Sequence, residues 1–174
     1  DTAAGAPAAG LSLLAFGSLS ELKGVDLLYE ALAATGVAGR ARLLLAGREE
    51  RPGLLAALAQ RFPGADVTHL GEYDSERLAS SDHPLRRAAS ACQFFVSASR
   101  APESFGLVLD EARALGLCAL LPRLGAFAER AAEGEGALFF EAGSADSLAR
   151  LLRQLLEDPE RLGALRVRLP APVR

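Results

Sequence analysis

The chain has 174 residues, of which 50% are hydrophobic and 24% are charged, and its formal net charge is −3. This length fits one domain with a sizeable core, and the acidic balance disfavours binding to nucleic acid. Because no apolar run approaches the roughly 20 residues of a membrane-spanning helix, any membrane contact is expected to lie in another part of the full-length protein.

In chain order, the expected elements are strand 11–16, helix 25–33, strand 41–47, helix 53–62, strand 65–71, one or two short helices within 74–91, strand 92–97, helix 105–115, strand 117–121, strand 136–140, helix 144–156 and a last helix that starts at Asp158-Pro159. The strands lack polar alternation, which is typical of strands buried on both faces of a parallel sheet. The pattern predicts an α/β fold: a Rossmann-like, doubly wound, mostly parallel six-stranded sheet with helices on both faces.

The ends of the chain differ from its middle in composition. Residues 1–10, DTAAGAPAAG, lack the basic segment of a signal peptide and are expected to form a linker. Residues 11–168 are expected to form one domain, and residues 169–174 are interpreted as a truncated tail. The sequence contains no Met and starts with Asp, which leads us to expect a piece of a longer chain.

The chain contains two cysteines, Cys92 and Cys118, in or beside apolar strand-like runs. Buried free thiols are favoured over a disulfide here, and they suit a reducing cytoplasm. No Cys/His spacing resembles a zinc site.

The loops after the first and fourth strands are the first places to look for a ligand. In the common strand order 3-2-1-4-5-6, ligands bind where the order reverses, between strands 1 and 4. These loops are GSLSELKG (17–24) and SRAPESFG (99–106). Lys23 stands at the start of a helix, where the helix dipole disfavours a cation. One interpretation is that Lys23 and the helix amides together bind an anion. The other is that the Lys23 side chain simply extends into solvent. Neither a Walker loop nor a G-x-G-x-x-G turn is present.

Two carboxylates flank the start of the helix that is expected to begin near Phe105. Glu103 precedes this helix, and Glu111 lies about two turns inside it, so they are separated by at most ~12 Å along the axis. A nucleoside diphosphate sugar has comparable dimensions, and carboxylates suit its vicinal diols because they accept hydrogen bonds through two oxygens. The alternative interpretation is that both glutamates are ordinary surface charge near a helix terminus.

Ordered sequence blocks give the chain a family resemblance over about residues 11–168. The sequence resembles the C-terminal, donor-binding domain of glycosyltransferase family 4 (group 1 glycosyltransferases), which has the GT-B architecture. The blocks are FGSLSELKGVDLLYEALA, ARLLLAGRE, VTHLGEYDSERLA, FFVSASRAPESFGLVLDEARALG and the stretch from LGAFAER to DPERLGAL. The most specific of them carries an E-x7-E motif as Glu103 and Glu111.

The resemblance implies a role for each matching residue. Glu103 would bind the hydroxyls of the donor sugar, Glu111 would hold the ribose, and Lys23 would neutralise the leaving diphosphate. Gly17 would let the phosphates approach the backbone. The amides of Phe105, Gly106 and Leu107 would contact the sugar and the diphosphate. The turn at Gly71–Glu72 would contact the base. The implied transfer retains the anomeric configuration and needs no metal or other cofactor.

One departure from the family pattern lies in the first loop. An arginine commonly follows the first-loop glycine in this family, but here the residue is Ser18, which cannot replace a bidentate, charged phosphate contact. Arg48, after Gly47, is a candidate for compensating this loss, with a solvated loop arginine as the alternative.

The resemblance also implies that half of an enzyme is missing. A GT-B enzyme needs an N-terminal domain that binds the acceptor, so we expect this chain alone to bind donor weakly and to transfer nothing. The expected partners are therefore a nucleoside diphosphate sugar and that domain, in a cytoplasmic protein whose peripheral membrane association is left open. Two alternatives remain: a nucleotide-sugar-binding or interaction module without transfer activity, and an α/β domain without a nucleotide site.

Several polar residues are given no functional role. We expect His69 to be packed or edge-exposed, His83 to be a loop residue without a visible partner, and Arg86-Arg87 to be solvated. Glu129 matches a family glutamate, but its implied role is weaker than that of Glu103 and Glu111.

Overall fold

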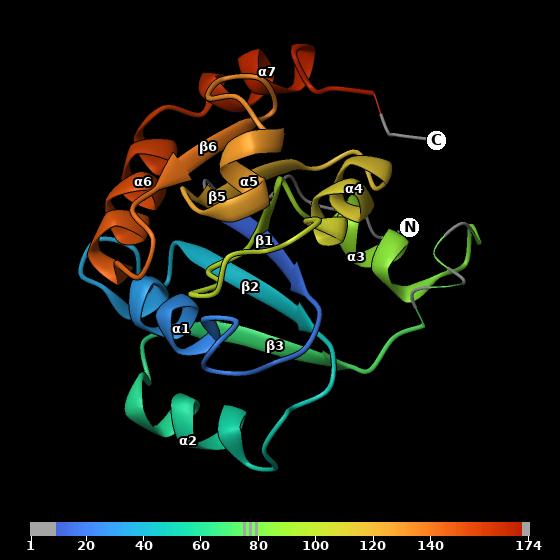
Figure 1. Ribbon diagram of the computed structural model, residues 1–174. Coiled ribbons are helices and arrows are strands. Elements are labelled where there is room, and N and C mark those ends of the chain that lie inside the picture. Colours follow the sequence, from blue (N-terminus) through green and yellow to red (C-terminus); the bar gives the residue numbers. More distant parts are fainter. Residues whose placement is uncertain (1–9, 75, 77, 79, 172–174) are drawn as a thin grey trace, which may run out of the picture.

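The computed structural model describes residues 10–74, 76, 78 and 80–171 (Figure 1). The expected linker, apart from Gly10, and residues 172–174 of the expected tail therefore lie outside the described residues.

Six parallel strands form a single sheet in the order β3-β2-β1-β4-β5-β6. The strands are β1 (Leu11–Phe16), β2 (Ala41–Ala46), β3 (Asp66–Gly71), β4 (Phe94–Val96), β5 (Cys118–Pro122) and β6 (Ala137–Phe140). The predicted fold class is thus confirmed, and the order reverses between β1 and β4. Strand β4 is shorter than the predicted 92–97, although Gln93 N–H and Ser97 N–H still donate to carbonyls of the neighbouring strands, at 2.9 and 3.1 Å.

The helices are α1 (Val25–Ala33), α2 (Leu54–Arg61), α3 (Pro84–Ser90), α4 (Leu107–Ala114), α5 (Gly125–Arg130), α6 (Ala145–Glu157) and α7 (Glu160–Val167). Two of them correct the sequence prediction. Helix α4 begins at Leu107, because Gly106 in front of it has a left-handed backbone (φ 63°), and Phe105 therefore precedes the helix. Helix α5 was not predicted, since its six residues are too few for a clear apolar period.

The helices cover both faces of the sheet and bury alternate strand residues (Figure 1). On one face, α1, α2, α6 and α7 pack on side chains such as Leu13, Leu43 and Leu120. On the other face, α3, α4 and α5 pack on neighbours such as Leu14 and Phe95. Because both faces are covered, the central strands are apolar at successive positions, which explains the continuous apolar runs in the sequence.

Both cysteines are buried and free, as predicted. Burial raises the pKa of the Cys92 thiol to about 11, and it also raises the pKa of Cys118. The thiols are therefore neutral and poorly nucleophilic near pH 7.

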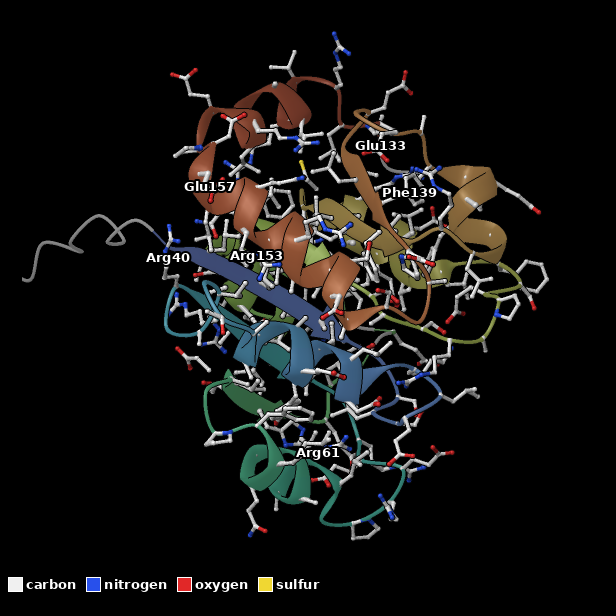
Figure 2. The ribbon with its side chains drawn as sticks, turned by 90° about the vertical axis from the view of Figure 1, so that its left-hand side faces the viewer. Arg40, Arg61, Glu133, Phe139, Arg153 and Glu157 are labelled. Atoms are coloured by element: carbon white, nitrogen blue, oxygen red, sulfur yellow. The ribbon has the colours of Figure 1, made fainter. Side chains whose placement is uncertain are left out.

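Helix α6 is held by its apolar face and by contacts near its two ends. Ser144 caps it by accepting a hydrogen bond from Ser147 N–H at 3.1 Å. Arg153, which is labelled in Figure 2, donates to the Thr35 carbonyl beyond α1 at 2.9 Å. Leu152 is fully buried between α6 and the sheet.

Replacing Leu152 with alanine is expected to lower the free energy of unfolding by about 3 kcal/mol, because it removes buried methyl groups and leaves a cavity. Denaturant unfolding of this variant, compared with the exposed Arg150→Ala variant on the same helix, measures the effect. Equal stabilities of the two variants would contradict the assigned packing of α6.

Within the described residues, no helix combines the length and the apolar character that a bilayer span requires.

Candidate functional site

A pocket of about 130 Å³ opens where the strand order reverses, beyond the carboxyl ends of β1 and β4. Its polar and backbone lining includes Gly17, Ser18, Lys23, Ser97 and Glu103. Val108 in the first turn of α4 also lines the pocket, so the start of this helix, where amides lack intrahelical partners, lies at its wall. The structure therefore brings both predicted loops to one pocket.

Lys23 and Glu103 form an ion pair in this pocket, although they are 80 residues apart in the sequence. The distance from Lys23 Nζ to Glu103 Oε1 is 2.5 Å, and the side chains are 41% and 20% exposed. Lys23 thus has a specific partner, and simple solvation does not describe it. The pocket presents a cation and a carboxylate that are in direct contact with each other.

The loop after β1 lies directly against the loop after β4. Gly24 has a left-handed backbone (φ 75°), and a Cβ on it would lie well under 3.0 Å from the carbonyl oxygen of Ala98. Arg100 N–H donates to the Leu22 carbonyl at 2.9 Å. This close approach needs glycine at position 24, and it fixes the backbone that carries Lys23 relative to the backbone that leads to Glu103.

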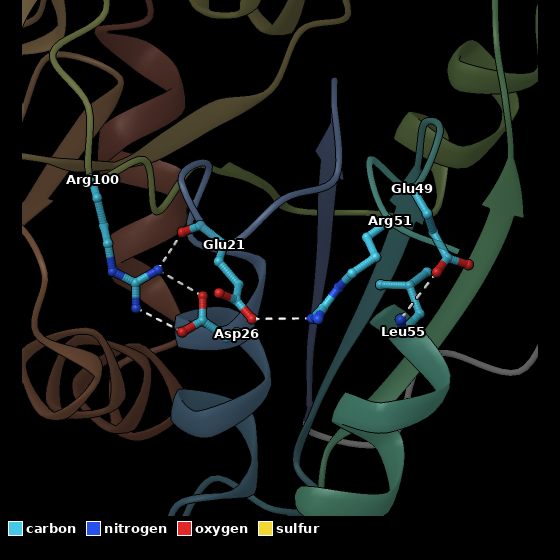
Figure 3. Close-up of polar contacts among 6 residues, drawn as sticks. All are labelled: Glu21, Asp26, Glu49, Arg51, Leu55 and Arg100. Atoms are coloured by element: carbon cyan, nitrogen blue, oxygen red, sulfur yellow. Dashed lines mark hydrogen bonds and ion pairs between the residues drawn. The ribbon is translucent and has the colours of Figure 1, made fainter. Parts of the chain in front are cut away.

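An arginine side chain ties the same two loops together from outside. The Arg100 guanidinium donates to both carboxylate oxygens of Asp26, each at 2.7 Å, and to the Glu21 carbonyl (Figure 3). Burial alone would raise the pKa of Asp26, but the hydrogen bonds and charge of Arg100, together with nearby backbone amides, leave this pKa below its usual value. Asp26 is therefore ionised at neutral pH, and its pair with Arg100 is a two-point contact between the loop after β4 and the first turn of α1.

The backbone of Glu103 is held from its other side by the start of α5. Ala126 N–H donates to the Glu103 carbonyl at 2.9 Å. Gly125 (φ 54°) lies so close that a Cβ would approach Glu103 N and Pro102 at 3.0 Å. Glu103 is thus fixed at its main chain, while its carboxylate faces the pocket.

Arg130 fixes the approach to α4. Its guanidinium donates to the carbonyls of Phe105 and Gly106 and makes two hydrogen bonds to Asp110, at 2.7 and 2.9 Å. These contacts orient the loop whose amides were predicted to face a diphosphate. Sequence reasoning missed Arg130, because no local motif signals a contact across 20 to 25 residues.

Glu111 is not among the residues that line the pocket of Lys23 and Glu103. Burial, and then the charge of Asp110, raise the pKa of Glu111. Burial and the charge of Glu111 raise the pKa of Tyr73 to about 12, and the Tyr73 ring packs edge-on against Phe16 at 5.9 Å between centroids. Tyr73, which follows Gly71–Glu72, was not predicted as a site residue; an aromatic after that turn was the available signal.

The loop after β2 lies against the loop after β1 and the end of β3, at the carboxyl edge of the sheet. Gly47 N–H donates to the Gly71 carbonyl at 2.8 Å, and a Cβ on Gly47 (φ 140°) would collide with the Gly17 carbonyl. A Cβ on Gly17 (φ 130°) would meet no atom within 4 Å, so space is open beside Gly17. The predicted turn at Gly71–Glu72 is therefore adjacent to the first loop through Gly47.

Two side chains stiffen the loop after β2. Arg51 reaches Glu21 of the first loop at 3.4 Å, and the Glu49 carboxylate accepts from Leu55 N–H at 3.2 Å, which caps the start of α2 (Figure 3). Arg48 is exposed and is not among the lining residues of the pocket. Its carbonyl, rather than its guanidinium, contacts the first loop, by accepting from Leu19 N–H at 3.0 Å.

The residues without a predicted functional role have structural ones or lie at the surface. His69 is exposed at the sheet edge, as predicted, and its Nε2 lies 2.8 Å from the Gly47 carbonyl. The expectation for His83 was wrong: this residue is buried, and its Nδ1 caps α3 by accepting from Leu85 N–H at 3.1 Å. Its Nε2 lies 2.8 Å from the Asp74 carbonyl, so the ring bridges the turn and the helix. Glu129 is exposed.

Three large apolar side chains lie exposed at the two loops: Leu22, Phe105 and Leu107, with exposed fractions of 59%, 74% and 66%. Phe105 and Leu107 were predicted through their backbone amides, and their side chains point away from the core. No three His, Cys, Asp or Glu side chains of the described ranges gather closely enough to hold a metal ion.

The chemistry of the site follows from these parts. A cation, a helix N-terminus and a glycine with open space beside it suit an anion such as a diphosphate. The Glu103 carboxylate in the same pocket is a hydrogen-bond acceptor that suits hydroxyl groups. The arrangement is therefore suited to a polyhydroxylated, phosphate-containing ligand.

Comparison with known proteins identifies a matching family and two curated relatives. A profile of the family described as "Glycosyl transferases group 1" matches residues 10–158. A D-inositol 3-phosphate glycosyltransferase of Nocardiopsis dassonvillei is 30% identical over 169 residues, and one of Rhodococcus opacus is 31% identical over 163 residues. These alignments cover 89% and 88% of this chain but only 37% and 35% of the relatives, so the chain spans little more than a third of their length.

Solved structures share the fold at lower identity. The Anabaena protein HepE in complex with UDP and glucose has a TM-score of 0.75 at 22% identity, covering 91% of this chain and 42% of HepE. The catalytic domain of the cholesterol-α-glucosyltransferase from Helicobacter pylori has a TM-score of 0.72 at 20% identity, covering 90% and 92%. The C-terminal domain of a group 1 glycosyl transferase from Francisella tularensis has a TM-score of 0.73 at 21% identity, covering 91% and 81%.

Proposed function

Because the chain belongs to the group 1 glycosyl transferases, we propose that it is the donor-binding domain of a retaining enzyme of the GT-B architecture. This enzyme transfers a sugar from a nucleoside diphosphate sugar to a glycan or glycoconjugate acceptor. The observation that carries the proposal is the convergence of Lys23, Glu103 and the start of α4 on one pocket at the reversal of strand order. A complex of HepE with UDP-glucose supports this class of ligand.

Each part of the donor is proposed to lie against a different loop at the carboxyl edge of the sheet. The diphosphate lies beside Gly17 and Ser18, against Lys23 and the amides around Phe105, Gly106 and Leu107. Glu103 accepts hydrogen bonds from the sugar on one side, and Glu111 accepts them from the ribose on the other. The base lies at the turn of Gly71 and Glu72, next to Tyr73.

The proposed transfer follows a front-side route, in which the departing phosphate assists the attack of the acceptor hydroxyl. Lys23 and the amides of α4 stabilise the negative charge that develops on the diphosphate. Glu103 orients the sugar so that its anomeric carbon faces the acceptor. We propose that no metal is needed for this transfer, and that a separate N-terminal domain supplies the acceptor site, so the 174-residue chain alone is inactive.

A non-catalytic binding module of the same fold is the second candidate. The exposed Ser18 favours it, because this serine lies in the pocket where an arginine would contact phosphate bidentately. Sugar transfer by the full-length protein, assayed with nucleoside diphosphate sugars and a panel of acceptors, separates the two candidates.

Ligand-observed NMR with UDP, GDP, ADP and TDP tests the donor site directly. We expect one of these nucleotides to bind the chain at about millimolar strength, ~4 kcal/mol. The Glu111→Ala variant is expected to lose this binding, because the ribose loses its acceptor. Binding that is equal in the variant would contradict the ribose role of Glu111, and no binding of any nucleotide to the chain would contradict a donor site in it.

Replacing Ser18 with arginine is expected to tighten nucleoside diphosphate binding by about tenfold, because a charge-assisted contact is added at an exposed position beside Gly17. Titration of the best nucleotide against both proteins measures the change. The Gln60→Arg variant adds the same single positive charge at an exposed position outside the pocket lining, and it controls for that charge. An equal gain in both variants, or no gain, would contradict the placement of the diphosphate.

A further inference from the structure

The two charged side chains of the pocket satisfy each other when no ligand is bound. Lys23 Nζ and Glu103 Oε1 lie 2.5 Å apart. The proposed function assigns them to different parts of the donor, the diphosphate and the sugar. A donor that draws these two side chains to its different parts separates this ion pair.

We propose that the Lys23–Glu103 ion pair is a latch that favours nucleoside diphosphate sugars over free nucleoside diphosphates. This inference rests on the proposed function of the pocket. A complete donor gives each partner a replacement: the diphosphate for Lys23 and the sugar hydroxyls for Glu103. A free diphosphate replaces only one of them.

The latch opens through its side chains and leaves the loops in place. The Lys23 backbone is fixed by the packing of Gly24 on Ala98, and the Glu103 backbone is fixed by the hydrogen bond from Ala126 N–H. Arg100 holds the loop after β4 to the Glu21 carbonyl of the loop after β1 and to Asp26 of α1, independently of the latch (Figure 3). The Lys23 side chain, at 41% exposure, has a route toward solvent and the open space beside Gly17.

The expected difference in affinity between a complete donor and a free diphosphate arises at Glu103. This side chain is only 20% exposed, so water replaces its lost cation incompletely, and leaving it without a partner has a cost. A free diphosphate that draws Lys23 away leaves Glu103 in that state. After transfer, the sugar leaves Glu103 as well, and re-formation of the latch then competes with the diphosphate for Lys23. The same contact thereby promotes release of the product nucleotide.

Inorganic pyrophosphate is the probe that tests the latch, because it carries the diphosphate but neither sugar nor base. The Glu103→Gln variant of the chain is expected to bind pyrophosphate about fivefold tighter than the parent chain, which corresponds to an ion pair worth about 1 kcal/mol. The Glu30→Gln variant removes the same charge from an exposed position on α1 and is expected to bind like the parent. Isothermal titration calorimetry at constant ionic strength gives the three constants.

A double-mutant cycle with Lys23→Gln locates the effect. In the Lys23→Gln background, the Glu103→Gln change is expected to give no gain in pyrophosphate affinity, because there is no cation to release. A second measurement compares UDP with UDP-glucose, and the Glu103→Gln variant is expected to prefer UDP-glucose less than the parent does.

The outcomes separate the latch from the function on which it rests. Pyrophosphate binding that is equal in the parent and in Glu103→Gln, or a gain that persists without Lys23, overturns the latch and leaves the donor site standing. If neither pyrophosphate nor any nucleotide binds the parent or the variants at millimolar concentration, the donor site itself is wrong, and the latch with it. Thermal unfolding of each variant verifies that the compared proteins are folded.

Discussion

Replacing Gly24 with alanine is expected to be among the most destabilising single substitutions in this chain, with a loss of more than about 3 kcal/mol of the free energy of unfolding. The left-handed backbone at this position costs a non-glycine residue about 1–2 kcal/mol by itself. The added Cβ would also collide with the Ala98 carbonyl, so the loops after β1 and β4 must separate. Denaturant unfolding measures the loss, and titration with the nucleotide that binds the parent chain is expected to show no binding.

The Gly53→Ala variant is the matched control for this substitution. Gly53 precedes α2 with φ 84°, as Gly24 precedes α1 with φ 75°, but a Cβ on Gly53 would meet no atom within 4 Å. Both variants therefore carry the backbone strain, and only Gly24→Ala carries the collision. Equal losses in the two variants would contradict the close packing of the two loops.

The second large effect is expected from Lys23→Gln in the full-length protein, assayed for the proposed sugar transfer. The rate of sugar transfer should fall by about 10²–10³-fold, the usual loss when a group that stabilises developing charge is removed. Lys23 is the positively charged side chain in the described lining of the pocket, and Ser18 in the same lining carries no charge. Steady-state kinetics with the donor identified by NMR measures the loss, which should appear in kcat as well as in kcat/KM.

The Arg51→Gln variant controls for loss of a positive charge near the site. Arg51 is exposed and reaches the first loop through Glu21, but it does not line the pocket, so transfer is expected to stay within about twofold of the parent, as for a weak surface ion pair. A Lys23→Gln enzyme that loses less than about tenfold, or a comparable loss in Arg51→Gln, would show that Lys23 does not carry the leaving-group charge.

The sheet could be predicted from the sequence because its signals are local. The run Leu11–Phe16 is closed by a glycine, and Ala41–Ala46 repeats the form, so the strands are visible without knowledge of their partners. Right-handed crossovers then leave few possible orders. The placement of Lys23 and Glu103 at one pocket followed from the strand order alone.

The details that sequence reasoning missed depend on local backbone conformation and on contacts between distant residues. The start of α4 at Leu107 depends on a left-handed glycine and on Arg130, which reaches back to the Phe105 carbonyl. His83 has a helix-capping role that becomes visible only when Pro84 begins a helix beside it. Tyr73 packs edge-on against Phe16 at the end of β1, which requires the loop after β3 to fold over toward the first strand. The contact of Arg130 with Phe105 has no fixed sequence spacing from which it can be predicted, whereas the His83 cap is local and was missed because Pro84 was not recognised as the first residue of a helix.

The strand order has a mechanical consequence for ligand binding. Three consecutive strands, β1 to β3, and three later ones, β4 to β6, meet at a seam between β1 and β4, where Leu13 pairs with Phe94 and Leu14 with Phe95. Lys23 belongs to the first half of the chain and Glu103 to the second, so a ligand that binds both residues contacts the two halves of the sheet at once. Such a ligand binds only when the two halves are joined, and it therefore raises the stability of the whole sheet in proportion to the logarithm of its concentration.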